Sequence, residues 1–199
     1  MAAVLDQDSF RIRNDDGNET TATWKAAANT GASLEVDTNW RIRFLIQNTG
    51  DATKSTNGSQ GWQLQYNLNS AGWNDVNASS SVVISSASPN LADNTSTTQQ
   101  LGAGTFDAIA ANKFDEVDGR TLGAVAQALS NGQETEVEYC WQLRSADVAN
   151  NDSIQLRVVY YSAGNTAFDT YTNTPTITVV EGGAPANLRR YTLSLSGVG

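Results

Sequence analysis

Apolar and polar residues alternate along many short stretches of the chain, and turn-forming residues separate these stretches. In TNWRIRFLIQNTG (residues 38–50), apolar side chains recur at every second position, and Arg41 and Arg43 stand between them. A similar stretch, SFRIRNDDG (residues 9–17), carries two more arginines. A period of two residues is typical of a β-strand with one buried face. We therefore expect strands near residues 8–13, 20–25, 39–47, 61–67, 72–76, 81–85, 97–100, 135–143, 154–161, 176–180 and 190–196.

Two pairs of these strands are predicted to form β-hairpins. GWQLQYNLNSAGWNDV (residues 61–76) joins two strand patterns through NSAG and places Trp62, Leu64 and Tyr66 on one face. VEYCWQLRSADVANNDSIQLRVVYY (residues 137–161) is interpreted as a longer hairpin, because its connection holds Asn and Asp residues that favour turns. Short alternating runs of this kind predict an all-β fold, an antiparallel β-sandwich of the immunoglobulin-like or jelly-roll-like kind.

Two stretches depart from the strand pattern. Residues 105–133 form a long excursion that holds the best helix candidate, residues 121–129, with Gly132 as a stop signal after it. A loop of this length is usually functional or lies against a neighbour. Further on, EGGAPAN is typical of a flexible linker, and LRRYTLSLSGVG then resumes the alternation. We expect a sandwich domain of residues 1–180, followed at 181–199 by a linker and an arm. The strand of this arm is expected to pair either with a sheet of its own chain or with the sheet edge of a neighbouring molecule.

Composition narrows the chemistry that the chain could perform. It has 199 residues, no histidine and one cysteine, Cys140, which is expected to be a small buried apolar residue on a strand. Without histidine, zinc sites of the usual kind and Ser-His-Asp triads are excluded. A net charge of −9 argues against nucleic-acid binding, which requires a basic surface. The N-terminus does not resemble a secretory signal, and no apolar run is long enough to span a membrane.

The densest acidic stretches all lie beside glycine in turn contexts, so we expect solvated loop tips there. A glycosidase would need two of these carboxylates in one cleft, and DEVDG lacks the ligand spacing of an EF-hand loop. Nucleotide-binding and acyl-transfer motifs do not occur, and we expect no enzyme activity, cofactor or metal. The residues concerned are Asp15, Asp16, Glu19, Asp115, Glu116 and Asp118.

The strand arginines and the tryptophans have two interpretations each. The arginines are expected to lie at outward strand positions and to pair with the abundant carboxylates, or alternatively to bind the carboxylates of a partner. Trp73, just past a turn, is expected at the surface, where it could belong to a glycan-binding platform. The other four tryptophans stand in strand patterns, and we expect core burial for Trp24, Trp40, Trp62 and Trp141.

Several segments carry a resemblance to a known group of proteins. They are SFRIRNDDGNETTATWKAAANT, NWRIRFLIQNTG, WQLQYNLNSAGWNDV, NLADNTSTTQQLGAGTF and EYCWQLRSADVANNDSIQLRVV, which together cover most of residues 8–180. This pattern is similar to one found in uncharacterised proteins of tailed bacteriophages, which look like virion accessory proteins with immunoglobulin-like or related β-sandwiches. Similar modules occur in large bacterial surface proteins. The resemblance implies a β-sandwich and supplies no catalytic residues.

From this resemblance we expect a non-enzymatic virion structural protein, made in the host cytoplasm, that acts as a capsid decoration (cement) protein. Its partners would be copies of itself, as a homo-oligomer such as a trimer, and the major capsid protein or other virion proteins, held by many repeated contacts. The alternatives are a tail or fibre protein that meets the host and a surface module that binds host glycans. The candidate partner-binding residues are Arg189, Arg190, Tyr191, Leu193, Leu195, Trp73, Arg41 and Arg43.

Overall fold

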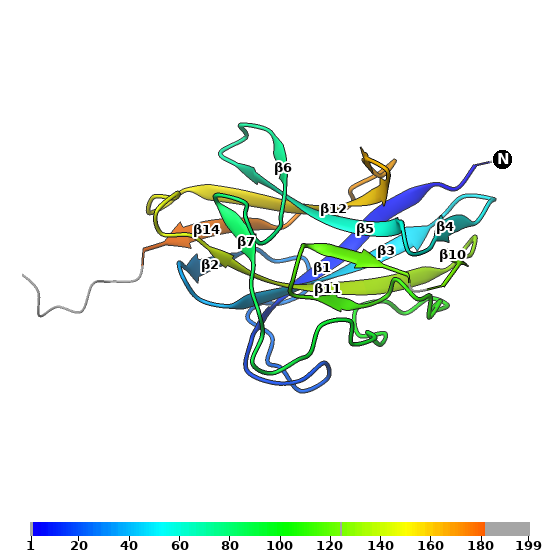
Figure 1. The fold of residues 1–199 in the computed structure, drawn as a ribbon, viewed down its shortest axis with the longest axis horizontal. Coiled ribbons are helices and arrows are strands. Elements are labelled where there is room, and N and C mark those ends of the chain that lie inside the picture. Colours follow the sequence, from blue (N-terminus) through cyan, green and yellow to red (C-terminus); the bar gives the residue numbers. More distant parts are fainter. Residues whose placement is uncertain (1, 124, 182–199) are drawn as a thin grey trace, which may run out of the picture.

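The protein is an all-β sandwich, as the alternating pattern predicts. A computed structural model describes residues 2–123 and 125–181, and in it two β-sheets pack face to face along the long axis of the molecule (Figure 1). The N-terminus lies at one end of this axis, and β14, the last strand of the described residues, points to the other end (Figure 1). We call the two layers sheet A and sheet B.

Sheet A has the strand order β1-β3-β11-β7, and the short β8 pairs with β11. Its long strands are antiparallel to their neighbours, whereas β8 runs parallel to β11. A register shift interrupts the β1–β3 pairing between Gln7 and Ser9. The strands are β1 (Leu5–Asn14), β3 (Trp40–Asn48), β7 (Val83–Ser85), β8 (Phe114–Asp115) and β11 (Glu134–Leu143).

Sheet B has the strand order β2-β14-β12-β5-β6; β13 also pairs with β12, and β9 pairs with β5. The β2–β14 pair is parallel and the others are antiparallel. The strands are β2 (Ala32–Glu35), β5 (Gln60–Leu68), β6 (Trp73–Asp75), β9 (Arg120–Leu122), β12 (Ser153–Ser162), β13 (Asn165–Thr166) and β14 (Thr176–Val180). A separate two-stranded ribbon is formed by β4 (Lys54–Thr56) and β10 (Gln127–Leu129).

The hydrophobic core lies between the inner faces of the two sheets. Alternate residues of β3 and β11 meet alternate residues of β5 and β12, and all belong to one buried cluster. Trp62 and Trp141 are fully buried in it, and Trp62 makes edge-to-face contacts with Tyr160 and Phe168. Removing side chains of this size from water is the main stabilisation of such a sandwich, about 1.5–3 kcal/mol for each fully buried one.

One of the two predicted hairpins is confirmed and the other is wrong. β5 and β6 pair across a turn in which Asn69, Ser70 and Gly72 have positive φ, as the NSAG segment predicts. β11 and β12 do not form a hairpin, because β11 pairs within sheet A and β12 within sheet B. The turn-rich connection between them crosses from one layer to the other. The two strands instead present their apolar sides to each other across the core.

The helix predicted for residues 121–129 is wrong. The segment supplies two short strands instead: β9 extends sheet B beside β5, and β10 pairs with β4. The hydrogen bonds that this segment makes with β5 and β4 outweigh its local preference for a helix. Gly132, with φ of +69°, belongs to the turn between β10 and β11. Residues 2–123 and 125–181 include no helix with the length and apolar composition that crossing a membrane requires.

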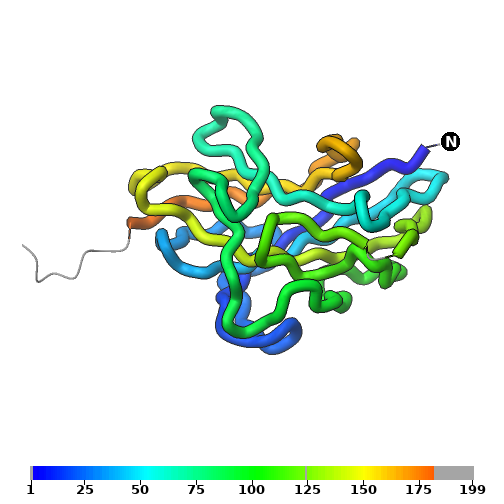
Figure 2. The backbone as a smooth tube through the Cα atoms, viewed as in Figure 1, coloured from blue at the N-terminus to red at the C-terminus, as the bar shows by residue number. Residues whose placement is uncertain are grey.

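Two long loops, residues 15–31 and 86–113, cover the outer face of sheet A (Figures 1 and 2). The strands predicted at 20–25 and 97–100 fall within these loops, whose described pairings are isolated bridges of Trp24 with Arg13, Ser96 with Lys113 and Phe106 with Glu134. The sheet A face that was expected to contact water is therefore covered by protein. The predicted strand at 190–196 lies outside the described residues, as do Arg189, Arg190, Tyr191, Leu193 and Leu195.

Candidate functional site

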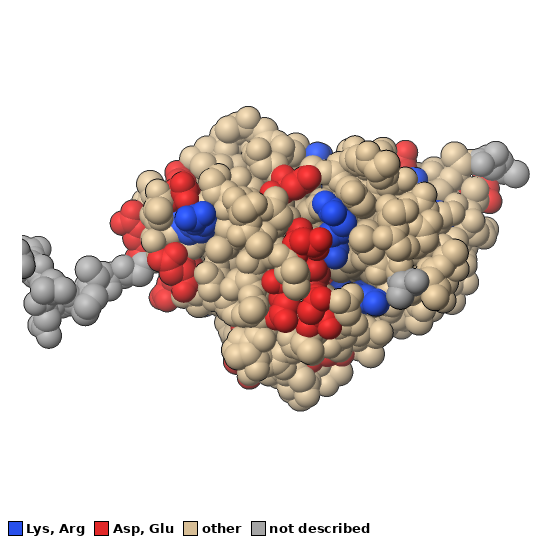
Figure 3. All heavy atoms as spheres, in the orientation of Figure 1, with Lys and Arg blue, Asp and Glu red and all other residues tan. Residues whose placement is uncertain are grey.

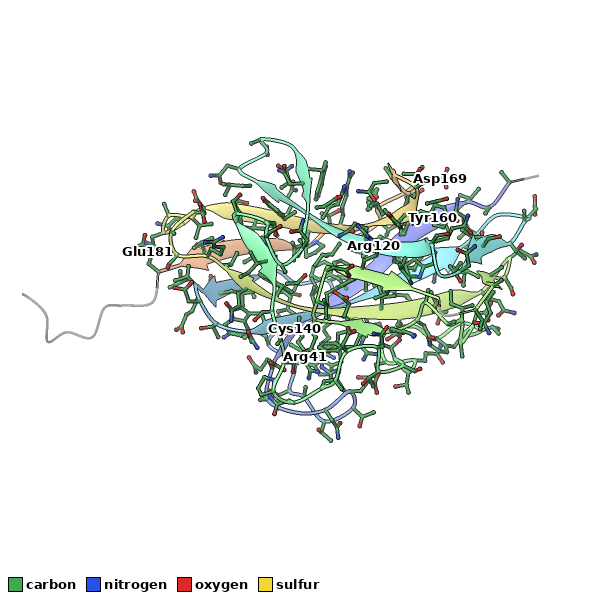
Figure 4. The ribbon with its side chains drawn as sticks, in the orientation of Figure 1. Arg41, Arg120, Cys140, Tyr160, Asp169 and Glu181 are labelled. Carbon is green, nitrogen blue, oxygen red and sulfur yellow. The ribbon has the colours of Figure 1, made fainter. Side chains whose placement is uncertain are left out.

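The covered face of sheet A holds a cluster of buried charges, which we call the ionic core. Its members are Arg13, Arg41, Arg43, Asp15, Glu19, Glu136 and Glu138. The register explains their meeting: Arg13 lies opposite Arg41 across β1 and β3, and Glu138 of β11 lies opposite Arg43. All three guanidinium groups are buried (Figure 4 labels Arg41).

Glu138 is the centre of the ionic core because its carboxylate contacts all three arginines. Its Oε2 accepts hydrogen bonds from Arg13 Nη1 at 3.0 Å and from Arg43 Nε at 2.7 Å. Its Oε1 lies 3.4 Å from Arg41 Nε, an ion pair without hydrogen-bond geometry. Charge-assisted contacts of this kind are about twice as strong as neutral hydrogen bonds, and burial keeps solvent from screening them.

The ionic core fastens both covering loops to the sheet. Arg43 Nη2 donates to Glu19 Oε1 at 2.6 Å, and Thr98 N donates to the same oxygen at 2.9 Å, so one carboxylate joins the two loops. Glu136 Oε1 accepts hydrogen bonds from the backbone amides of residues 100, 101 and 102. The second loop thus wraps around a carboxylate, which supplies the partners that its buried amides require.

The pKa directions follow from this geometry. Burial alone would lower the pKa of Arg43, but Glu138, Glu136 and Glu19 attract the guanidinium strongly enough to raise it. Burial lowers the pKa of Arg13, and Glu138 only partly offsets the effect. Burial would raise the pKa of Glu19, but hydrogen bonds from Thr98 and the charge of Arg43 lower it. The native arrangement therefore favours the charged forms of Arg43 and Glu19.

Arg41 and Arg43 therefore differ from the surface residues that the sequence suggested. They have no exposed surface in the folded chain, and the carboxylates that they bind belong to the same chain. The missed members are Glu136 and Glu138, which occupy alternate positions of the sequence ETEVEY; Glu138 lies opposite Arg43 of β3, and Glu136 lies opposite Leu45. The alternating glutamates indicate that β11 has one charged face, as the alternating arginines do for β3.

Cys140 follows the expectation of a buried strand residue. It is 1% exposed and packs with Leu91 and Phe114 in a small apolar cluster beside the ionic core (Figure 4 labels Cys140 next to Arg41). Burial raises the pKa of its thiol, and the nearby Asp15 raises it further. The thiol is therefore held in its neutral, unreactive form.

A second buried acidic group lies where the two sheets meet. β8 and β9 are joined by the tight turn DEVDG, and Asp115 accepts a 2.7 Å hydrogen bond from Gly119 N. Burial, reinforced by the nearby Asp118 and Asp93, raises the pKa of Asp115 to about 8. Asp115 is 4% exposed, Glu19 is 7% exposed and the Asp15 side chain is 2% exposed, so these three are not the solvated loop tips that we expected. Asp115 is therefore largely protonated at neutral pH.

The outer face of sheet B carries aromatic and planar polar side chains. The Arg157 guanidinium lies 4.1 Å from the ring centroid of the half-buried Trp73, and Arg157 Nε donates to Gln65 Oε1. Gln65 Nε2 in turn donates to Asp75 Oδ1 at 2.8 Å. Near the other end of β12, Arg120 stacks on Tyr161 at 3.9 Å. We call Trp73, Arg157, Gln65 and Asp75 the Trp73 surface.

Charged groups elsewhere gather in a stripe. Figure 3 shows acidic side chains crossing the middle of the visible face, next to a smaller group of basic ones.

Within residues 2–123 and 125–181, no three His, Cys, Asp or Glu side chains converge in a way that could hold a metal ion. Comparison of the chain with family models, curated proteins and solved structures finds no match.

Replacing Glu138 with Gln should lower the free energy of unfolding by about 3–5 kcal/mol, because three buried guanidinium groups lose their shared counter-charge. The matched control is Asp147→Asn, which breaks the exposed Arg144–Asp147 pair and should cost less than about 1 kcal/mol. Urea denaturation at constant pH measures both. Equal losses in the two variants would contradict a central role for Glu138.

The pH dependence of stability should show the protonation of Asp115. Its folded pKa of about 8 exceeds the ordinary value near 3.8, so the folded state binds one more proton than the unfolded state between these values. Stability should then fall by about 1.4 kcal/mol per pH unit as pH rises from 5 towards 8.

Asp115→Asn keeps an oxygen for Gly119 N and should flatten this slope, as measured by thermal or urea unfolding at several pH values. The exposed carboxylate of Asp152 has a lowered pKa, so Asp152→Asn should leave the slope above pH 5 unchanged. A slope that persists in Asp115→Asn would assign the proton to another group.

Proposed function

We propose that the protein is a non-enzymatic structural protein of a tailed-phage particle, and that it decorates the capsid by bridging neighbouring subunits. The observation that carries the proposal is the ionic core. It ties two long loops and three strands into one body through charges that lie far apart in the sequence. A body of this kind suits a role that is mechanical, and it needs neither a metal nor a disulfide to stay rigid.

The way in which the ionic core is built supports this role. Buried ion pairs often contribute little to the free energy of unfolding, since apolar side chains of similar volume stabilise a core as well or better. Their geometric demands favour one arrangement of the loops over others, which matters for a protein that must present the same surface at every site of a symmetric shell. Repeated weak contacts then add up to tight attachment.

The test is to locate the protein on particles of the phage that encodes it. Mass spectrometry of purified particles should find it in many copies, and electron microscopy with a labelled antibody should place it on the head. Full-length protein added to heads that lack it should co-sediment with them. Absence from particles would overturn the proposal, and a position on the tail would favour the tail or fibre alternative.

The Trp73 surface favours a second candidate function, the binding of host glycans. Sugar rings stack their C–H faces on aromatic rings, and their hydroxyls pair with planar amides, guanidinium groups and carboxylates. Trp73, Arg157 and Asp75 supply a ring, a guanidinium group and a carboxylate on one sheet face, and the buried amide of Gln65 links Arg157 to Asp75. This function would be compatible with a place on the particle surface.

An oligosaccharide array followed by titration calorimetry tests this second candidate. Wild-type protein should bind at least one glycan class, and Trp73→Ala should weaken that binding at least tenfold. The control is Trp24→Ala, because Trp24 also stacks with arginines but lies beside β1 in the other sheet. Failure of the wild type to bind any glycan, or equal effects of the two substitutions, would dismiss it.

A further inference from the structure

A surface pocket of about 140 Å³ lies at the end of the sandwich where β3 ends and β11 begins. Its lining includes Gln47, Thr49, Gly104, Gly132, Gln133 and Glu134. Figure 1 shows the β4–β10 ribbon and the N-terminus at this end of the molecule, and Asn48 of the pocket hydrogen-bonds Leu129 O of β10. We call this hollow the end pocket.

The end pocket contains a buried carboxylate that lacks a cationic partner among the ion pairs of residues 2–123 and 125–181. Glu134 is 3% exposed. Its Oε1 accepts hydrogen bonds from Gln99 Nε2 at 2.7 Å and Gly104 N at 2.9 Å, and its Oε2 accepts one from Gln47 Nε2 at 3.3 Å. Glu136 and Glu138, next along the same strand face, each bind arginine. A carboxylate buried without a cation is costly, so the end pocket is suited to a positive group.

The backbone of the second loop lies very close to the Glu134 carboxylate, at positions where glycine leaves room for it. A Cβ at Gly102 would collide with Glu134 Oε1, and one at Gly104 would come within 2.7 Å of Oε2. The amide of Asp107 donates to the Glu134 carbonyl at 2.7 Å, which brings a second acidic residue close to the pocket. Glu134 is thus the charged residue of the pocket lining, with Asp107 nearby.

The complementary charge is present in the sequence of the same chain. Residues 182–199 contain two charged side chains, Arg189 and Arg190, and therefore carry +2. Since the whole chain carries −9, residues 1–181 carry −11. A guanidinium group suits a carboxylate better than an ammonium does, because its fork of donors matches the two oxygens.

The position of the last described residues favours a pocket on another copy. Val180 pairs with Glu35, whose carbonyl accepts a hydrogen bond from Trp40 at the start of β3, whereas the end pocket lies at the other end of that strand. Glu181 accordingly lies at the opposite end of the long axis (Figure 4). The eight residue steps of β3 span about 27 Å, and the eight residue steps from Glu181 to Arg189 could cover such a distance only if they were fully extended.

We propose that the end pocket receives Arg189 or Arg190 from a second copy of the chain, with Glu134 as the carboxylate that binds it. The contact joins the tail end of one copy to the pocket end of the next, so it is head-to-tail and produces rings or open chains of copies. It rests on the proposed structural function, for which it supplies the contact between neighbouring copies.

Four full-length proteins and one control variant test the proposal by light scattering after gel filtration, at low and high salt. The wild type should form oligomers at low and high salt alike, because the carboxylate of the pair is buried and ions screen buried pairs little. The variant Arg189→Gln/Arg190→Gln lacks the donor, and Glu134→Gln lacks the acceptor; both should be monomeric. Thr49→Trp leaves Glu134 in place and obstructs the pocket, so it should also be monomeric even if Glu134→Gln folds poorly.

Mixing the donor-deficient and acceptor-deficient variants gives the decisive result. The arm of the Glu134→Gln variant should enter the intact pocket of the other variant, so the mixture should form dimers and nothing larger. Glu181→Gln, at the opposite end, is the control and should oligomerise like the wild type. A monomeric wild type, self-association of the variants alone or a mixture that stays monomeric would overturn the contact. Co-sedimentation with phage heads reports on the proposed function separately.

Discussion

The contact of one buried carboxylate with three arginines organises one side of this protein. Glu138 gathers Arg13, Arg41 and Arg43 from two neighbouring strands, and these arginines in turn hold the carbonyl and carboxylate groups of the loops above them. Without this shared counter-charge, three like charges would remain side by side in a region that excludes water. The arrangement therefore requires that the loops close completely, because partial closure would leave charges unpaired.

The sandwich thus combines two different cores on the two faces of sheet A. The inner face packs Ile42, Phe44 and Tyr139 against sheet B by the hydrophobic effect, which tolerates modest changes of shape. The outer face packs charges and hydrogen bonds, which require definite directions and distances. The first core supplies most of the stability, and the second fixes the path of the two long loops.

The sequence predicts the strands of the inner core well, because alternation with a period of two is a local signal. It predicts the β5–β6 hairpin for the same reason, since Asn69, Ser70 and Gly72 favour that turn. The position of β12 in the other sheet and the replacement of a helix by β9 and β10 depend on contacts between distant segments. Arg41 and Arg43 were singled out, yet their burial depends on loops whose course is set by the completed fold. Glu134 belongs to the same alternation as Glu136 and Glu138, but its end pocket exists only once β3, β11 and the second loop meet.

The packing of Cys140 beneath Leu91 and Phe114 has a practical consequence. As the sole thiol of the chain, it lies under one of the loops that the ionic core fastens, with a pKa raised by burial. The rate at which a maleimide or an aromatic disulfide modifies this sulfur therefore reports how often that loop opens. The native chain therefore contains its own reporter of this local opening, and a thiol reagent reads it without any substitution.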